Sequence, residues 1–134
     1  MKNKILIISG DPNSINSEII YKCWRGLSNA RKENIYVISN YELIKQQLKI
    51  LKYPIKISKV KNISKIKNNK LKIIDIDLKF KNPFNVPSKT SSNFIKKSLS
   101  LGHKLALETN CKGIINCPIN KKLLKKKIKV LQNF

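Results

Sequence analysis

Short, continuously apolar runs separated by segments of helical period limit the fold of this chain more strongly than any other feature of its sequence. Such runs occupy residues 4–9, 34–39, 71–77 and 112–117, which read KILIIS, NIYVIS, LKIIDID and KGIINC. They are rich in isoleucine and too short for helices, which is typical of strands covered on both faces. Residues 54–60 instead mix apolar residues with lysine, as expected for a half-exposed edge strand.

The segments between these runs carry apolar residues at helical spacing. A first helix of about 14 residues is predicted from Asn16, which is a good N-cap, with Glu18 in its first turn. Its apolar face is marked by residues four apart: Ile15, Ile19, Cys23 and Leu27. A second helix is predicted at residues 41–51.

Two further helices are predicted in the second half of the chain. One begins at Ser92, capped by Ser91 or Ser92, and follows a connection at residues 79–92 that carries two prolines and no regular pattern. Its apolar stripe comprises Ile95, Leu99, Gly102 and Ala106, with Phe94, Leu101 and Leu105 alongside. The last helix is predicted to begin after Pro118, with Asn120 as its N-cap.

The resulting order is β-α-β-α-β-β-loop-α-β-α, which implies an α/β sheet with helices on its faces. A chain of 134 residues is long enough for one domain with a core and too short for two ordinary domains. Residues 1–134 are therefore predicted to form a single α/β domain.

The net charge of +22 has two interpretations, a surface that binds an anionic partner or ordinary solvated lysines. Lysine and arginine can neutralise the phosphates of nucleic acid or of an anionic membrane. However, only Arg25 and Arg31 among the 29 basic residues are arginine, and lysine is spread along the whole chain. We therefore expect solvated surface lysines rather than a nucleic-acid interface, and a basic binding protein remains the alternative.

The cysteines and the apolar runs bear on where the protein resides. Cys23, Cys111 and Cys117 are odd in number and form no C-x-x-C pair, which favours free thiols in a cytoplasmic protein. The apolar run at residues 5–8 is shorter than the core of a signal peptide, which spans about 7–15 residues. No run approaches the roughly 20 residues of a membrane span, so no membrane association is expected.

Two junctions between a strand and a helix are candidates for ligand binding, since ligands of open α/β sheets bind beyond the carboxyl ends of strands. The first reads GDPNSINSE at residues 10–18, where Gly10 permits a turn and Asp11 either offers a carboxylate or forms an Asx turn. The second reads INCPINKK at residues 115–122. Here Lys121 in the first turn of a helix could hold a phosphate or carboxylate together with exposed N–H groups, or could be an ordinary surface lysine.

Two other residues attract attention and are predicted to be structural. His103 is the only histidine, so it cannot build a multidentate metal site, and packing at the edge of its helix is expected. Cys117 has no histidine placed to activate it, and an inert buried thiol is expected.

Together the two junctions resemble the 4-hydroxythreonine-4-phosphate dehydrogenase family, which is PdxA-like. ISGDPNSINSEII resembles the opening motif of that family, with six matches: Gly10, Asp11, Pro12, Ile15, Glu18 and Ile19. HKLALETNCKGIINCPINKKLL resembles its second signature, a strand ending in Pro-Ile-Asn-Lys, with four matches: Pro118, Ile119, Asn120 and Lys121. The similarity spans essentially the whole chain.

The resemblance implies an isocitrate/isopropylmalate dehydrogenase-like fold, of which this chain would be the N-terminal portion of a two-domain α/β homodimer. It also implies oxidation and decarboxylation of 4-phosphooxy-L-threonine, in pyridoxal 5'-phosphate biosynthesis, with NAD and a divalent metal such as Zn, Mg, Mn or Co. Carried onto this sequence, it makes Asp11, Asn120 and Lys121 candidates for binding the small phosphorylated substrate. It assigns no catalytic residue and no metal ligand here.

Two departures limit what can be transferred from the family. Residues 13–17 read Asn-Ser-Ile-Asn-Ser where the family has Ala-Gly-Ile-Gly-Pro, and Ser14 cannot replace a glycine needed for close backbone approach. The family is more than twice as long, and its Pro-Gly-His-Thr-Glu segment and three metal-binding histidines have no counterpart here. We therefore expect a truncated member that is inactive without the missing part. The alternatives are a non-enzymatic basic protein that binds nucleic acid or anionic surfaces, and a decayed gene product.

Overall fold

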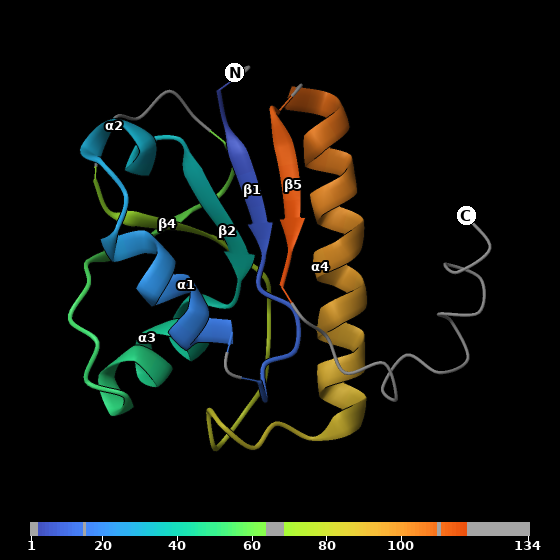
Figure 1. Cartoon of the computed structure of the whole chain (residues 1–134). Helices are drawn as coiled ribbons and strands as arrows, with labels where there is room; N and C mark the ends of the chain where they lie inside the picture. Colours follow the sequence, from blue (N-terminus) through green and yellow to red (C-terminus); the bar gives the residue numbers. More distant parts are fainter. Residues whose placement is uncertain (1–2, 15, 64–68, 110, 118–134) are drawn as a thin grey trace.

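A computed structural model describes residues 3–14, 16–63, 69–109 and 111–117 of the chain. Its centre is a five-stranded sheet with the order β3-β4-β2-β1-β5, in which every neighbouring pair is parallel (Figure 1). The chain is thus a mixed α/β fold, as the alternation of apolar runs and helical periods predicts.

Each predicted strand is present, with slightly narrower bounds than the apolar runs. The five strands are β1 Ile5–Ile8, β2 Ile35–Ser39, β3 Ile57–Val60, β4 Leu71–Asp75 and β5 Gly113–Asn116. All five residues of β2 are buried, because it lies in the middle of the sheet. The lysine-containing strand β3 lies at an edge, as predicted, and Lys59 is exposed there.

The helices cover both faces of the sheet (Figure 1). Helix α4, Ser88–Thr109, packs Phe94 and Leu105 against Leu6, Ile8 and other side chains of one face. Helices α1, Asn16–Arg25, and α3, Tyr41–Ile50, cover the opposite face. A short helix α2, Asn29–Lys32, capped by the hydroxyl of Ser28, precedes β2. The sequence did not predict α2, because four residues are too few to show a helical period.

The start of α1 differs from the sequence prediction. Asn16 is the first helical residue and not the N-cap, and the helix ends at Arg25, short of the 14 residues expected. The hydroxyl of Ser14 accepts a hydrogen bond from the Asn16 N–H at 3.3 Å. Ser14 therefore satisfies an N–H group at the helix start, which is the capping role predicted for Asn16. Leu27 follows the helix and packs against the core as a loop residue.

The start of α4 was also placed too late. The helix begins at Ser88, and the Ser91 N–H donates to the Pro87 carbonyl at 2.9 Å, so Ser91 is inside the first turns and is not a cap. The buried stripe runs through Ser91, Phe94, Ile95, Ser98, Gly102 and Leu105. Phe94, Ile95, Gly102 and Leu105 were predicted on the apolar side of this helix. Ser91 and Ser98 were missed because serine carries no apolar signal, and Leu99 and Ala106 are only partly buried.

Gly102 marks the closest approach of α4 to the sheet. A Cβ added at this position would lie 2.5 Å from Ile8 Cδ1 and 3.4 Å from Ile38 Cδ1. Only a residue without a side chain fits between the helix and these two strands unless Ile8 changes its rotamer. His103, next to Gly102, is exposed, so its predicted packing at the helix edge is wrong. The predicted last helix, with Asn120 and Lys121, lies outside the described residues.

Candidate functional site at the carboxyl edge of the sheet

Strands β1 and β5 are neighbours, and this brings the beginnings of the two predicted junctions together. Ile8 pairs with Asn116 in the parallel register, and the Cys117 N–H donates to the Ile8 carbonyl at 2.9 Å. Gly10 and Cys117 therefore leave adjacent strands at the same edge of the sheet, where ligands of open α/β sheets bind. The remainder of the second junction, with Asn120 and Lys121, lies outside the described residues.

The loop between β1 and α1 (residues 9–14) is held in a tight turn. Gly10 has φ of 77°, in the left-handed region that glycine adopts without strain, as predicted. Asp11 is only 7% exposed, and its Oδ1 accepts the Asn13 N–H at 2.9 Å. This contact is an Asx turn, so the structural alternative for Asp11 is realised. A further role of Asp11 in ligand binding stays a prediction.

Asn13 stands where the family has alanine, and it connects the two loops of this edge. Its Nδ2 donates to the Val86 carbonyl at 2.8 Å, and its Oδ1 accepts the Val86 N–H at 2.6 Å. The side-chain amide thus both donates to and accepts from the backbone of one residue, as the backbone of a neighbouring strand does in a sheet. It fastens the β1–α1 loop to the loop between β4 and α4 (residues 76–87).

Ser14, which replaces a family glycine, adopts an ordinary backbone conformation. Gly10 is the described glycine with positive φ, and Lys52 is the one described residue of another type with positive φ. The Ser14 hydroxyl donates to the Asp11 carbonyl at 2.8 Å while its backbone N–H donates to the same oxygen at 3.2 Å. The substituted residues therefore build the turn with side-chain hydrogen bonds instead of glycine conformations.

Gln47 of α3 is a second connection that sequence reasoning missed. Its Nε2 donates to the Pro12 carbonyl at 2.8 Å and to the Pro83 carbonyl at 2.7 Å, and the residue is 2% exposed. Proline carbonyls in irregular loops have no hydrogen-bond partner of the kind that neighbouring strands supply in a sheet. A buried amide that donates to two of them therefore stabilises both loops. The available signal was a glutamine on the apolar stripe of a helix, between Leu43 and Ile50.

Buried polar groups continue along the edge to β2 and β4. Asn40 caps α3 by accepting the Leu43 N–H at 2.9 Å and donates to the Ile76 carbonyl at 2.8 Å. Within the described part of the chain, the buried hydroxyls of Ser17 and Ser39 have no hydrogen-bond partner. Such hydroxyls at the carboxyl ends of strands or at a helix start can donate to a ligand or to water.

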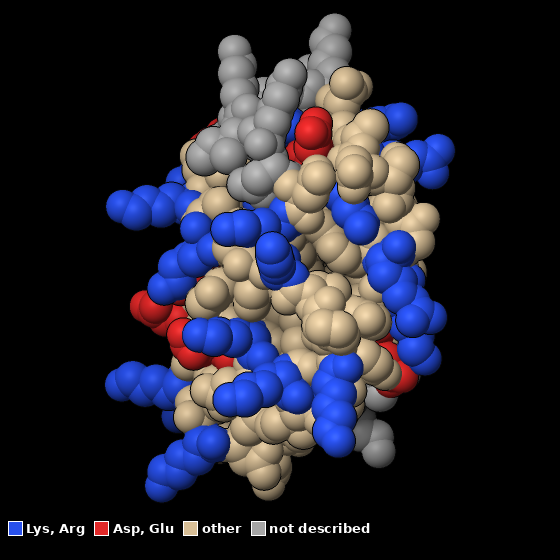
Figure 2. All heavy atoms as spheres, turned by 90° about the vertical axis from the view of Figure 1, so that its left-hand side faces the viewer, with Lys and Arg blue, Asp and Glu red and all other residues tan. Residues whose placement is uncertain are grey.

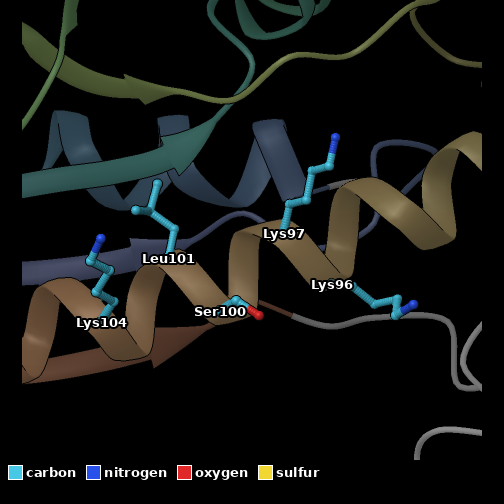
Figure 3. Close-up of a pocket in the computed structure, with 5 residues that line it drawn as sticks. All are labelled: Lys96, Lys97, Ser100, Leu101 and Lys104. Atoms are coloured by element: carbon cyan, nitrogen blue, oxygen red, sulfur yellow. The ribbon is translucent and has the colours of Figure 1, made fainter.

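Among the described residues on one face of the molecule, the basic side chains are dispersed. Figure 2 shows lysine and arginine side chains spread over one face of the molecule, with tan surface and acidic residues between them. On α4, a shallow hollow of about 400 Å³ is lined by five residues: Lys96, Lys97, Ser100, Leu101 and Lys104. The ammonium groups of its three lysines point in different directions (Figure 3), so they do not converge on one anion.

The thiols and acids give no sign of a nucleophile or a metal centre among the described residues. Burial raises the pKa of the Cys117 thiol, and Cys23 adds to the effect. The protonated, unreactive thiol is therefore favoured, in agreement with the inert buried thiol predicted from the sequence. The pKa of Glu18 is lowered by its hydrogen bonds from Lys22 and Tyr53. No group of three or more histidine, cysteine, aspartate or glutamate side chains that could hold a metal occurs in the described ranges. The described residues therefore do not by themselves form a site for the divalent metal that the family resemblance implies.

The described residues thus form an α/β fold with a parallel sheet and a polar edge built from loops. Comparison with known proteins identifies the family. A family model described as pyridoxal phosphate biosynthetic protein PdxA matches residues 31–132. This chain belongs to that family. The match includes the Pro-Ile-Asn-Lys signature at residues 118–121, whereas the Gly-Asp-Pro motif lies before it.

Individual relatives agree with this assignment. The chain is 29% identical over 133 residues to a Fusobacterium nucleatum protein named for D-threonate 4-phosphate dehydrogenase activity. Solved 4-hydroxythreonine-4-phosphate dehydrogenases from Burkholderia phymatum and Klebsiella pneumoniae share the fold, with TM-scores of 0.76 and 0.75 and identities of 19% and 20%. These alignments cover 93%, 93% and 92% of this chain in that order, and 39% of each of the three relatives. The chain thus spans about two-fifths of the length of the relatives it matches.

No helix among the described residues is long and apolar enough to cross a membrane.

Proposed function

We propose that this chain forms the N-terminal portion of a PdxA-family dehydrogenase and supplies one wall of its substrate site. The observation that supports this proposal is the meeting of the two signature junctions at adjacent strand ends, where Cys117 N–H donates to the Ile8 carbonyl. A ligand at this edge would lie beside the β1–α1 loop and the chain that follows β5. Asp11, Asn120 and Lys121 are the residues we propose to contact it.

The proposed reaction is the oxidation of a 4-phosphorylated hydroxy acid. For 4-phosphooxy-L-threonine, the alcohol would give up a hydride to NAD and a proton to solvent, and the β-keto acid formed would lose carbon dioxide. D-threonate 4-phosphate is the second candidate substrate, because it is the compound in the name of the Fusobacterium relative. Both compounds carry a phosphate, which Lys121 could hold at the helix start predicted there from the sequence.

The chain's own share of the chemistry would be to shape the site. Asn13 and Gln47 hold the two loops in one arrangement, so the wall would be formed before substrate arrives. Since the described residues offer no metal site, we propose that metal binding and hydride transfer depend on segments of the family beyond these 134 residues. We further propose that the 134-residue chain is a cytoplasmic protein with no turnover of its own, that it does not bind nucleic acid, and that it pairs as the family's homodimer does.

The direct test is an assay of the purified 134-residue chain with NAD and each of the two phosphorylated acids. Mg²⁺, Mn²⁺, Zn²⁺ and Co²⁺ are added in separate reactions. We expect no NADH formation under any of these conditions. Turnover of either substrate by this chain alone would contradict the proposed division of the site.

A second assay tests the basic-protein alternative. A random single-stranded oligonucleotide is titrated into the chain at low and at physiological salt. We expect weak binding that disappears at physiological salt, because dispersed lysines give only counterion-release affinity. Tight binding at physiological salt would favour the nucleic-acid alternative.

A further inference from the structure

An open hollow on the β4–α4 loop is lined by residues other than those proposed above to contact the dehydrogenase substrate. It has a volume of about 550 Å³, within the range of small-molecule sites. The described residues that line it are Lys79, Phe80, Lys81, Asn82, Asn85 and Pro87. We propose that this hollow binds a mononucleotide, a small molecule with one phosphate and one flat ring.

The lining has the two chemical characters that such a ligand needs. Phe80 is half-buried, and with Pro87 and the aliphatic stems of the two lysines it offers an apolar surface on which a base can stack. The ammonium groups of Lys79 and Lys81 are donors for a phosphate. None of the six described lining residues is acidic, so no carboxylate opposes an anion there.

The two asparagines of the hollow add the capacity to recognise a base edge. A side-chain amide carries both donors and an acceptor, which is the combination found on the edge of a nucleobase. Asn82 Oδ1 accepts the Phe84 N–H at 2.9 Å, and the Asn85 N–H donates to the Asn82 carbonyl at 3.1 Å. Asn82 therefore fixes the turn, and the exposed side chain of Asn85 is the one we assign to the ligand.

The loop is fixed in place at two further points. Gln47 holds the Pro83 carbonyl at 2.7 Å, and Asn13 holds both polar groups of the Val86 backbone at 2.6 and 2.8 Å. Loops ordered before binding lose less conformational entropy when a ligand arrives. The hollow on α4 differs in that none of its described lining residues is aromatic, and its ammonium groups diverge (Figure 3).

The test is a titration of the 134-residue chain with AMP, followed by NMR of the backbone amides and by calorimetry. Adenosine and inorganic phosphate are titrated separately, so that ring and phosphate are measured alone. We expect saturable shifts confined to the amides around residues 79–87, and tighter binding of AMP than of either fragment. The measurement needs no turnover, so its result is independent of the proposed dehydrogenase function.

Variants separate this site from general attraction to a basic protein. The double variant K79Q/K81Q should weaken AMP binding about tenfold, as expected for the loss of charge-assisted contacts to a phosphate. F80A should weaken binding of AMP about five- to tenfold and leave that of inorganic phosphate unchanged, because the base then loses the aromatic ring on which it stacks.

The matched control is K96Q/K97Q, which removes the same charge from exposed and half-buried positions of α4. It should change the AMP affinity less than about twofold, as expected for a screened surface charge. Equal weakening by the two double variants, or shifts spread over the whole basic surface, would overturn the proposal. So would equal affinity for AMP and inorganic phosphate, since the ring would then contribute nothing.

Discussion

The side chain of Asn13 and the backbone of Val86 exchange two hydrogen bonds, of 2.8 and 2.6 Å, across 73 positions of sequence. Through this pair the β1–α1 loop and the β4–α4 loop become one polar wall at the carboxyl edge of the sheet. Because Val86 is buried, removing the amide leaves its N–H and carbonyl without these partners.

Replacing Asn13 by alanine should therefore lower the free energy of unfolding by about 1–3 kcal/mol. Hydrogen exchange of the Val86 amide should accelerate more than that of the core strands, because the loops separate locally. Urea denaturation and exchange measured by NMR provide the two readouts. N29A, at an exposed residue of α2, is the control and should stay within about 0.5 kcal/mol of the parent.

Replacing Gln47 by methionine tests the second connection between the loops. Methionine has a similar length and is apolar, so packing on α3 is retained while the Pro12 and Pro83 carbonyls lose their donor. We expect a loss of roughly 2–3 kcal/mol in the free energy of unfolding, since these carbonyls are then buried without that partner. A variant as stable as the parent would show that the glutamine serves packing alone.

Gly102 gives a prediction about packing between α4 and the sheet. G102A gains about 1 kcal/mol of helix propensity, yet its Cβ would lie 2.5 Å from Ile8 Cδ1. Overpacking of this kind costs about 1–3 kcal/mol, so a net destabilisation is expected. I8V removes the Cδ1 atom. The double variant G102A/I8V should therefore lose less free energy of unfolding than the two single variants lose in sum. G26A is the control, because its Cβ would lie 3.7 Å from the Cys23 carbonyl oxygen.

Lys72 gives a prediction about pH. It lies fully buried on β4, with its Nζ 5.1 Å from the centre of the Tyr36 ring. Burial lowers the pKa of this amine. Lys4 lowers it further, and Glu33 opposes the effect. Between the lowered pKa in the folded state and the ordinary value of 10.5, the unfolded chain binds more protons than the folded chain. Stability must therefore rise with pH in that window. Urea midpoints of the parent should increase with pH relative to K72M, and parallel curves would contradict this prediction.

The sequence predicted the sheet well because buried parallel strands have an unmistakable composition. β2 and β4 were located from apolar runs, and β3 was assigned to an edge from its lysines. Lys72 shows the limit of this reasoning, because a lysine inside an apolar run reads as exposed until the ring of Tyr36 is seen beside it.

The candidate site was only partly predictable for a related reason. Gly10 and Asp11 were found because glycine and Asp-Pro have local meaning at a strand end. Asn13 and Gln47 act on residues 73 and 36 positions away, and no local pattern indicates such partners. The loss of the family glycines was interpreted as damage to the loop, whereas Asn13 and Ser14 supply it with hydrogen bonds.

The central claim is that this chain supplies the N-terminal wall of a PdxA-family dehydrogenase site, and a chimera tests it most directly. Residues 1–134 are joined to the part of the Fusobacterium relative that follows its matched region. NADH formation is then measured with D-threonate 4-phosphate and 4-phosphooxy-L-threonine. We predict turnover of at least one substrate by the chimera, none by the 134-residue chain, and a reduced rate in the chimera carrying both N13A and Q47M. A folded chimera that turns over neither substrate, or turnover by the chain alone, would contradict the account.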